Sequence, residues 1–238
     1  MRVALVTGAG RRLGRELALG LGRAGFTVAV HYRTEPDSAR RTLELLKEAG
    51  GDGAVFHADL SKPDAASRLS SKVALQLGRL DALVHSASVW IEKPVVDVTG
   101  ADWDQTFSVG PRAGFFLAQG AAEALASSDG AILFVSDVAA TKAWPRHVPH
   151  AAAKAALEAL VRNLAVALAP RVRVNGLAPG IVLPPDTLPA EEVERLVART
   201  PLRRIVAVED LISMALALVE NRSVTGQVVS VDAGRSVG

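Results

Sequence analysis

The chain has 238 residues, of which 49% are hydrophobic and 22% are charged, a composition typical of a globular protein without long disordered segments. Its formal net charge is +2 and its basic pairs are short and scattered, which excludes the clustered basic surface of a nucleic-acid or membrane binder. The chain contains no cysteine, so disulfides, thiolate catalysis and cysteine-ligated zinc are excluded.

The predicted elements alternate along almost the whole chain. Short β-branched runs predict strands at 2–7, 26–32, 53–58, 80–85, 130–136, 171–177 and 227–232. Longer Ala- and Leu-rich stretches predict helices at 12–24, 36–49, 63–78, 101–127, 148–169 and 208–220. Because the strands are nearly all apolar, helices should cover both faces of the sheet. We therefore expect an α/β fold, a doubly wound Rossmann fold with a seven-stranded parallel sheet.

Length and the distribution of apolar and proline residues predict the number of domains and the cellular compartment. The length fits one α/β domain, so we expect a single dinucleotide-binding domain over residues 1–238. A proline-rich stretch at about 180–203 predicts a loop with a short helix, positioned as a lid over a substrate site. No apolar stretch approaches the roughly 18 residues of a membrane span, and the first strand is too short for a signal peptide. We expect a cytoplasmic protein.

A glycine-rich turn follows the first predicted strand. It comprises Thr7, Gly8, Gly10, Arg11, Arg12, Leu13 and Gly14 and opens the first predicted helix. Three glycines in this context allow a sharp turn, close approach of a pyrophosphate and tight packing of helix on strand. The helix N-terminus adds amide donors and a favourable dipole. The turn therefore predicts a dinucleotide site.

The end of the second strand distinguishes between the two nicotinamide dinucleotides. An acidic residue at this position would accept hydrogen bonds from a ribose without a 2′-phosphate, and the sequence has none. Arg33, with Arg12 in the turn, can pair with a 2′-phosphate, and Thr34 can donate its hydroxyl. We therefore expect NADP(H). Asp59, after the third strand, is a candidate partner for the adenine amino group, although a loop Asp can equally cap a helix.

Four segments carry a resemblance to the short-chain dehydrogenase/reductases: Thr7 to Gly14, the strand from Leu80 to Ser88, the segment from His150 to Lys154, and Asn175 to Gly180. The resemblance implies further cofactor contacts at His31, Leu60, Ser86, Ala87, Ser88, Lys154, Pro179, Gly180 and Val182. That family uses a Tyr-x-x-x-Lys pair, a Ser thirteen residues before the Tyr, and an Asn on the preceding helix. Lys154 matches, whereas His150, Asp137 and Gly110 stand in place of the Tyr, the Ser and the Asn.

The chain resembles the pteridine reductase branch of that family, which also carries Asp at the position of Asp137. Arg12, the His31-Tyr32-Arg33 segment and Ser88 are similar to that branch, and Trp90 falls where it places an aromatic ring. The resemblance implies a substrate site formed by Arg12, Ser88, Trp90, Asp137 and His150. A flat pterin could then lie between Trp90 and the nicotinamide. Trp90 could equally be an ordinary half-buried core or interface aromatic.

The predicted catalytic residues are Asp137, His150 and Lys154. Spacing of i, i+4 places His150 and Lys154 on one helix face, so Lys154 could hold the nicotinamide ribose while His150 meets the substrate. An imidazole has an ordinary pKa of about 6.5 and can donate a proton at neutral pH, the more so beside a carboxylate. Its ring is shorter than a phenol, however, and a helix-start or packing role for His150 remains an alternative.

The sequence leaves three functions open. The first is an NADPH-dependent reductase of a pteridine-like or related conjugated substrate. The second is an NADP(H)-binding sensor or partner protein with impaired catalysis, and the third is a reductase of ketones or 3-oxoacyl thioesters. A metal site at His147, His150 and Asp137 is disfavoured, because no third ligand stands at helical spacing. Small residues on several faces of the helix after His150 predict a homodimer or homotetramer.

Overall fold

A parallel sheet forms the centre of the molecule. The computed structural model describes residues 1–62, 64–185 and 188–238. The strands are β1 (Arg2–Thr7), β2 (Phe26–Tyr32), β3 (Asp52–His57), β4 (Ala82–His85), β5 (Ala131–Val135), β6 (Arg173–Pro179) and β7 (Val228–Val231). Their order is β3-β2-β1-β4-β5-β6-β7, and every neighbouring pair is parallel. The predicted seven-stranded doubly wound sheet is confirmed.

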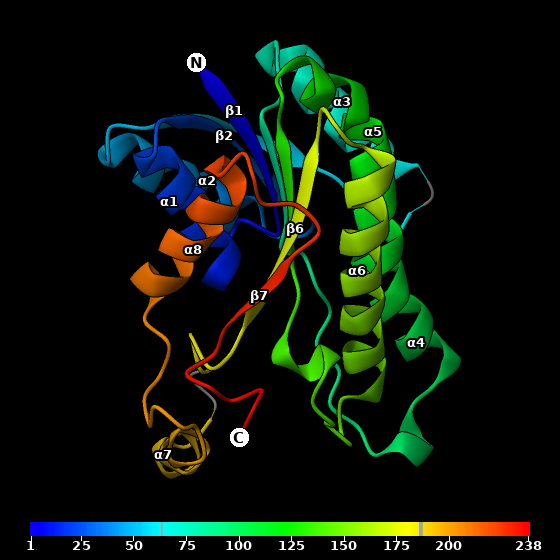
Figure 1. The fold of residues 1–238 in the computed structure, drawn as a ribbon, viewed down its shortest axis with the longest axis vertical. Helices are drawn as coiled ribbons and strands as arrows, with labels where there is room; N and C mark the ends of the chain where they lie inside the picture. Colours follow the sequence, from blue (N-terminus) through cyan, green and yellow to red (C-terminus); the bar gives the residue numbers. More distant parts are fainter. Residues whose placement is uncertain (63, 186–187) are drawn as a thin grey trace.

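Helices cover the two faces of the sheet. They are α1 (Arg12–Arg23), α2 (Pro36–Glu48), α3 (Ala65–Leu77), α4 (Gly100–Phe107), α5 (Ala113–Ser127), α6 (Val148–Ala167), α7 (Ala190–Ala198) and α8 (Val208–Glu220). Figure 1 shows α1, α2 and α8 on one face and α3, α5 and α6 on the other. Each layer packs a separate apolar core against the sheet, the first around Leu17 and Leu46 and the second around Leu117 and Phe134.

The connection between β4 and β5 differs from the prediction. A single helix over 101–127 was expected, but α4 ends at Phe107 and a π-helical turn, η2 (Ser108–Arg112), separates it from α5. Gly110 within that turn has non-helical torsion angles, with φ of −80° and ψ of −105°. The prediction of one helix was wrong because Pro111 lacks an amide hydrogen and disfavours a helical conformation at the residue before it.

Other element boundaries moved by a few residues. The strand predicted at 171–177 occupies Arg173–Pro179, and the strand predicted at 80–85 begins at Ala82. The helix predicted at 63–78 is α3, which begins at Ala65, and its predicted first residue lies outside the described residues. The short helix expected within 180–203 is α7, which has no buried residue.

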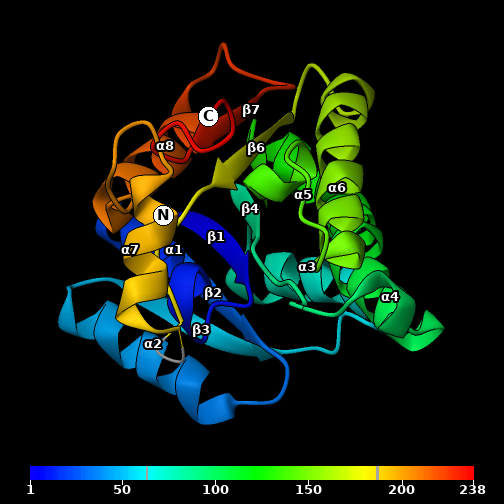
Figure 2. The ribbon, with the colours of Figure 1, turned by 90° about the horizontal axis from the view of Figure 1, so that it is seen from below.

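The sheet topology determines where a site can form. The strand order reverses between β1 and β4, and register pairs Thr7 of β1 with His85 of β4. In open parallel sheets, ligands bind at the carboxyl ends of the strands beside such a reversal. Figure 2 looks onto the sheet from the lower end of Figure 1, where the start of α6, the segment around α7 and the C-terminus lie.

Candidate active site

The glycine-rich turn after β1 leads into an open helix start. Gly8 has a φ of +67°, and a Cβ placed on Gly14 would lie 2.1 Å from the Gly8 carbonyl oxygen, so only glycine fits at position 14. No side chain caps the start of α1, and its first turn holds no acidic residue. The uncapped amides and the adjacent Arg11 and Arg12 suit an anion. The turn therefore fits the pyrophosphate of a dinucleotide.

His31 supports the turn from beneath. The Gly8 amide donates to its Nδ1 at 3.1 Å, so its Nε2 carries the hydrogen and donates to the Ala58 carbonyl, also at 3.1 Å. The ring is buried, and burial lowers the pKa of His31 to about 4, which keeps it neutral at pH 7. Both nitrogens are thus engaged by the chain itself, which makes His31 a support of the turn.

The two arginines of the turn point in different directions. Arg11 forms an exposed ion pair with Glu35 at 3.1 Å. Arg12 has a φ of +50°, and its Nη2 donates to the Leu183 carbonyl at 2.5 Å. Leu183 belongs to the segment between β6 and α8, so Arg12 joins the phosphate turn to that segment.

The predicted adenosine-binding residues gather after β2 and β3. Arg33 and Thr34 are exposed directly after β2, while Leu60 is buried. Asp59 accepts from the Ser61 amide at 3.0 Å and from the Ser61 hydroxyl at 2.7 Å. The pKa of Asp59 is lowered chiefly by the Ser61 hydroxyl, and the Arg33 charge contributes to the same shift. Arg33 and Asp59 are therefore close enough to contact the same end of a bound dinucleotide, its adenosine.

The loop after β4 is tied to the turn by a buried hydrogen-bond chain. The Thr7 hydroxyl oxygen accepts from the Ser86 and Ala87 amides at 3.1 Å, so its own hydrogen points to His85 Nδ1, 2.9 Å away. His85 Nε2 then donates to the Gly110 carbonyl at 3.1 Å. The pKa of His85 is lowered to about 4 by burial and, secondarily, by the Lys154 charge. His85 was not among the residues predicted from the sequence, although a polar residue in an apolar strand is a recognisable signal.

The remaining predicted cofactor contacts lie at the end of β6. Pro179 closes the strand, Gly180 donates its amide to the Val231 carbonyl at 3.0 Å, and Val182 is buried. A Cβ on Gly180 would lie 2.6 Å from the Cα of Asp232, so glycine is required there. Because the strands are parallel, the end of β6 lies at the same carboxyl-terminal side of the sheet as the turn after β1.

The three predicted catalytic residues converge between β5 and the first turns of α6. Lys154 is buried and donates from Nζ to the Val135 carbonyl at 2.7 Å. Burial lowers the pKa of Lys154 to about 8, against the opposing influence of the Asp137 charge. Asp137 uses Oδ1 to accept from the Ala139 amide at 2.8 Å, starting the 3₁₀ turn η3 (Val138–Ala140). Its Oδ2 remains directed at His150.

His150 is buried between two oxygen acceptors. Its Nε2 lies 3.5 Å from Asp137 Oδ2 and makes no hydrogen bond within the described residues, and its Nδ1 lies 3.4 Å from the Val89 carbonyl. A doubly protonated ring would present a hydrogen to each oxygen. This arrangement suits a group that holds and releases a proton.

Aromatic rings cover His150 on its outer side. Trp90 is 55% exposed, and its ring centroid lies 4.7 Å from that of His150 and 4.5 Å from that of His147. Trp144, which the sequence analysis did not assign, contacts Trp90 edge to face at 5.9 Å. Ser88 is also exposed beside this loop. A large aromatic left half-exposed above a buried imidazole suits a flat ligand.

No metal centre is evident in the part of the chain that the structure describes. There, no three His, Cys, Asp or Glu residues are grouped to hold an ion. His147 Nδ1 lies 3.1 Å from the Ile91 carbonyl. Within the same residues, no helix is long and apolar enough to cross a membrane.

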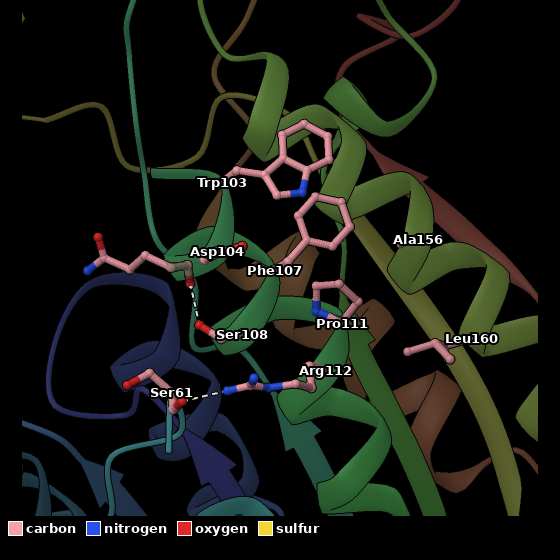
Figure 3. A pocket seen from close by; sticks show the side chains of 10 residues that line it. Ser61, Trp103, Asp104, Phe107, Ser108, Pro111, Arg112, Ala156 and Leu160 are labelled. Carbon is pink, nitrogen blue, oxygen red and sulfur yellow. Dashed lines mark hydrogen bonds between the residues drawn. The ribbon is translucent and has the colours of Figure 1, made fainter. Parts of the chain in front are cut away.

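A separate groove of about 860 Å³ lies on the outer side of α4, η2 and α6. Figure 3 shows Trp103, Phe107 and Leu160 around it, with Arg112 donating to the Ser61 carbonyl at 2.5 Å. None of the predicted cofactor, substrate or catalytic residues lines it.

The chain has relatives of similar length. A family model described as Enoyl-(Acyl carrier protein) reductase matches residues 8–236. The hydroxynaphthalene reductase-like protein Arp2 of Metarhizium robertsii is 33% identical over 98% of this chain and 94% of its own length.

Solved structures show the same fold throughout. FolM alternative dihydrofolate reductase 1 from Brucella suis, in complex with NADP, superposes with a TM-score of 0.93 at 32% identity and covers 100% of this chain and 96% of that one. The angucycline C-6 ketoreductase LanV with bound NADP gives a TM-score of 0.91 at 29% identity, over 100% and 96% of the two chains. These matches, with the glycine-rich turn and the Lys154 position, show that the chain belongs to the short-chain dehydrogenase/reductase family of oxidoreductases.

Proposed function

We propose that this protein is an NADPH-dependent reductase of a pteridine-like or related conjugated ring. The proposal rests on the surroundings of His150. This buried imidazole lies between the Asp137 carboxylate and the half-exposed Trp90 ring, and its Nε2 makes no hydrogen bond within the described residues. A neighbour named as an alternative dihydrofolate reductase and a relative named as hydroxynaphthalene reductase-like support a conjugated substrate.

The residues around the turn fit NADP(H). Gly14 lets the start of α1 pack directly against the Gly8 carbonyl, and that helix start is uncapped. The two residues directly after β2 are Arg33 and Thr34, neither of them acidic. Arg33 and Thr34 would hold the 2′-phosphate, and Asp59 would meet the adenine end. Lys154, fixed by the Val135 carbonyl, would orient the nicotinamide ribose. When bound, NADPH supplies the hydride.

The chain's own residues manage the proton. A substrate ring stacked on Trp90 lies beside His150, which donates a proton to the nitrogen or oxygen next to the carbon that receives the hydride. The Asp137 carboxylate, with Oδ2 3.5 Å from His150 Nε2, would stabilise a positive charge on the imidazole. The substrate gains one hydride and one proton, and the imidazole regains its proton from solvent.

A substrate panel tests the function. NADPH oxidation is measured with dihydrobiopterin, dihydrofolate, a hydroxynaphthalene and an acetoacetyl thioester, for the native protein and His150→Tyr. We expect turnover of the ring substrates and little of the thioester. Preference for the thioester would instead support a 3-oxoacyl reductase. NADPH binding without turnover of any compound, in either protein, would support a sensor.

The segment 180–203 acts in this proposal as the substrate lid. Arg12 contacts Leu183 within it, so the segment meets the phosphate turn. The lid belongs to a single catalytic domain formed by the whole chain.

A homodimer or homotetramer is the proposed assembly. Trp103 and Phe115, on α4 and α5, are 41% and 38% exposed, and the groove beside Ala156 and Leu160 is apolar. A second copy covering this face would bury these groups. Light scattering should give a dimer or tetramer for the native protein and a smaller species for Ala156→Glu.

A further inference from the structure

The guanidinium of Arg235, the fourth residue from the end of the chain, lacks the hydrogen bonds that comparable arginines make. Of the half-buried arginines in the described residues, Arg15 donates to the Gly10 carbonyl and Arg173 to the Leu218 carbonyl, whereas the Arg235 guanidinium has no hydrogen bond or ion pair. The Arg235 guanidinium lies over the Trp144 ring, with its carbon 5.2 Å from the ring centroid. A partly desolvated guanidinium with five unused donors is suited to an incoming anion.

Hydrogen bonds hold the backbone around Arg235 in place. The Asp232 carboxylate accepts from the Gly234 amide at 2.9 Å and from the Ser236 amide at 2.6 Å, which folds the tail into a tight turn. Lys142 donates from Nζ to the Arg235 carbonyl at 2.8 Å and joins the tail to the segment after η3. Arg235 is therefore held next to the candidate active site.

A second cation is brought to the same place. Pro201 packs against Gly234, and the Leu202 amide donates to the Ala233 carbonyl at 3.1 Å, so the end of the 180–203 segment lies on the tail. This contact brings Arg199 toward Arg235. The pKa of Arg235 is lowered chiefly by burial, and the Arg199 charge adds to the shift while Asp137 and Asp232 oppose it. The two arginines repel each other, and an anion between them would relieve that repulsion.

The cationic pair borders the aromatic surface of the site. The Trp144 ring lies under Arg235 and contacts Trp90, which in turn contacts His150. The Trp90 ring therefore has His150 as one neighbour and Trp144, the ring under Arg235, as another. Asp137 lies within electrostatic range of Arg235, which disfavours an anion close to the reacting atoms and favours one on an extended substituent.

We propose that Arg235, assisted by Arg199, binds a carboxylate carried on a substituent of the substrate, so that the protein selects conjugated ring compounds that are also acids. The proposal rests on the reductase function for its substrate ring. The carboxylate would pair with the Arg235 fork, for which charge-assisted bidentate bonds are the preferred geometry.

Binding and turnover of two ring compounds test it. Dihydrofolate carries carboxylates on an extended substituent and dihydrobiopterin carries none. We expect Arg235→Ala to raise the KM for dihydrofolate at least tenfold and to change that for dihydrobiopterin less than twofold, with kcat retained. Arg199→Ala should give a smaller change in the same direction. Arg23→Ala, an exposed arginine at the far end of α1, is the matched control.

A binding assay separates this proposal from the reductase function. Folate and biopterin are titrated against the NADP-loaded protein by tryptophan fluorescence, without turnover. Selective loss of folate binding in Arg235→Ala supports the carboxylate site even if neither compound is reduced. Equal affinities for the two compounds in the native protein, or equal losses in the variant, overturn it whether or not the enzyme reduces pterins.

Discussion

The phosphate turn and the substrate side of the molecule use buried histidines in opposite ways. His31, beneath the turn, has both ring nitrogens in hydrogen bonds to the backbone and is held neutral by burial. His150, on the substrate side, is equally buried, yet its Nε2 faces a carboxylate without a hydrogen bond among the described residues. Burial of a polar ring therefore does not by itself identify a catalytic group. An unsatisfied nitrogen directed at a charged partner does so more specifically.

The largest expected effect concerns the rigidity of the turn. In Gly14→Ala, the new Cβ would lie 2.1 Å from the Gly8 carbonyl oxygen, so α1 must move away from the strand. We expect a loss of about 3 kcal/mol in the free energy of unfolding and of most NADPH affinity. Gly10→Ala, whose Cβ would lie 3.3 Å from the Ser38 Cβ, should lose much less stability than Gly14→Ala. Urea unfolding without nucleotide checks both; equal stability of the two variants would contradict a tightly packed turn.

Exchanging each histidine for phenylalanine sharpens the contrast between the two regions. His150→Phe should lower kcat by about 10²- to 10⁴-fold, the range for loss of a general acid, with stability nearly unchanged. His31→Phe leaves the Gly8 amide and the Ala58 carbonyl unpaired and should cost about 2–4 kcal/mol of stability. Steady-state kinetics and thermal unfolding are measured on both. Unchanged turnover in His150→Phe would remove it from the proposed mechanism.

Lys154 gives the site a pH-dependent stability. Its pKa in the folded protein is about 8, against 10.5 for an ordinary lysine, so folding is penalised while the amine is charged. The penalty is full below pH 8 and disappears as the pH rises toward 10.5, because the unfolded state then binds the extra proton. Relative to Lys154→Met, the native protein should gain on the order of 2 kcal/mol between pH 7 and pH 10. Urea unfolding at both pH values measures this difference; a constant difference would mean that the buried amine keeps an ordinary pKa.

The smallest expected effect lies at the exposed end of the nucleotide site. Arg33→Ala removes a charge-assisted contact to a 2′-phosphate, so NADPH should bind about 10- to 100-fold more weakly while NADH changes little. Fluorescence titration with both nucleotides gives the ratio. If NADPH and NADH lost affinity equally, Arg33 would contribute only general surface charge, and Arg12 would be the residue that selects the cofactor.

The sequence predicted the sheet and most elements because apolar strands and amphipathic helices have distinct periods. Gly110 was noted only as a departure from a family pattern, within a predicted helix over 101–127, and the π-helical turn there was not predicted. Helical periodicity on both sides of η2 is continuous in the sequence, and the break depends on one proline and on the His85 hydrogen bond to Gly110.

The site was predicted in part. The turn, Lys154 and the approach of Asp137 to His150 follow from local spacing and from the parallel topology. Trp144 and Arg235 were not assigned, because their position depends on the C-terminal tail folding back over residues nearly one hundred positions earlier. No local sequence pattern predicts a contact between such distant segments. In the structure, the Asp232 carboxylate accepts hydrogen bonds from the Gly234 and Ser236 amides, which is typical of an Asx turn and orders the tail.

The hydrogen bonds from Thr7 to His85 and from His85 to Gly110 join the ends of β1 and β4 to the π-helical turn η2. Protein engineers who transplant a phosphate turn from a homologue, or who restore the missing asparagine at position 110, would alter a buried ring that both segments share. Space alone permits the asparagine, since a Cβ at Gly110 meets only Ala153 at 3.7 Å. Loop grafts in this scaffold should therefore exchange positions 7, 85 and 110 together.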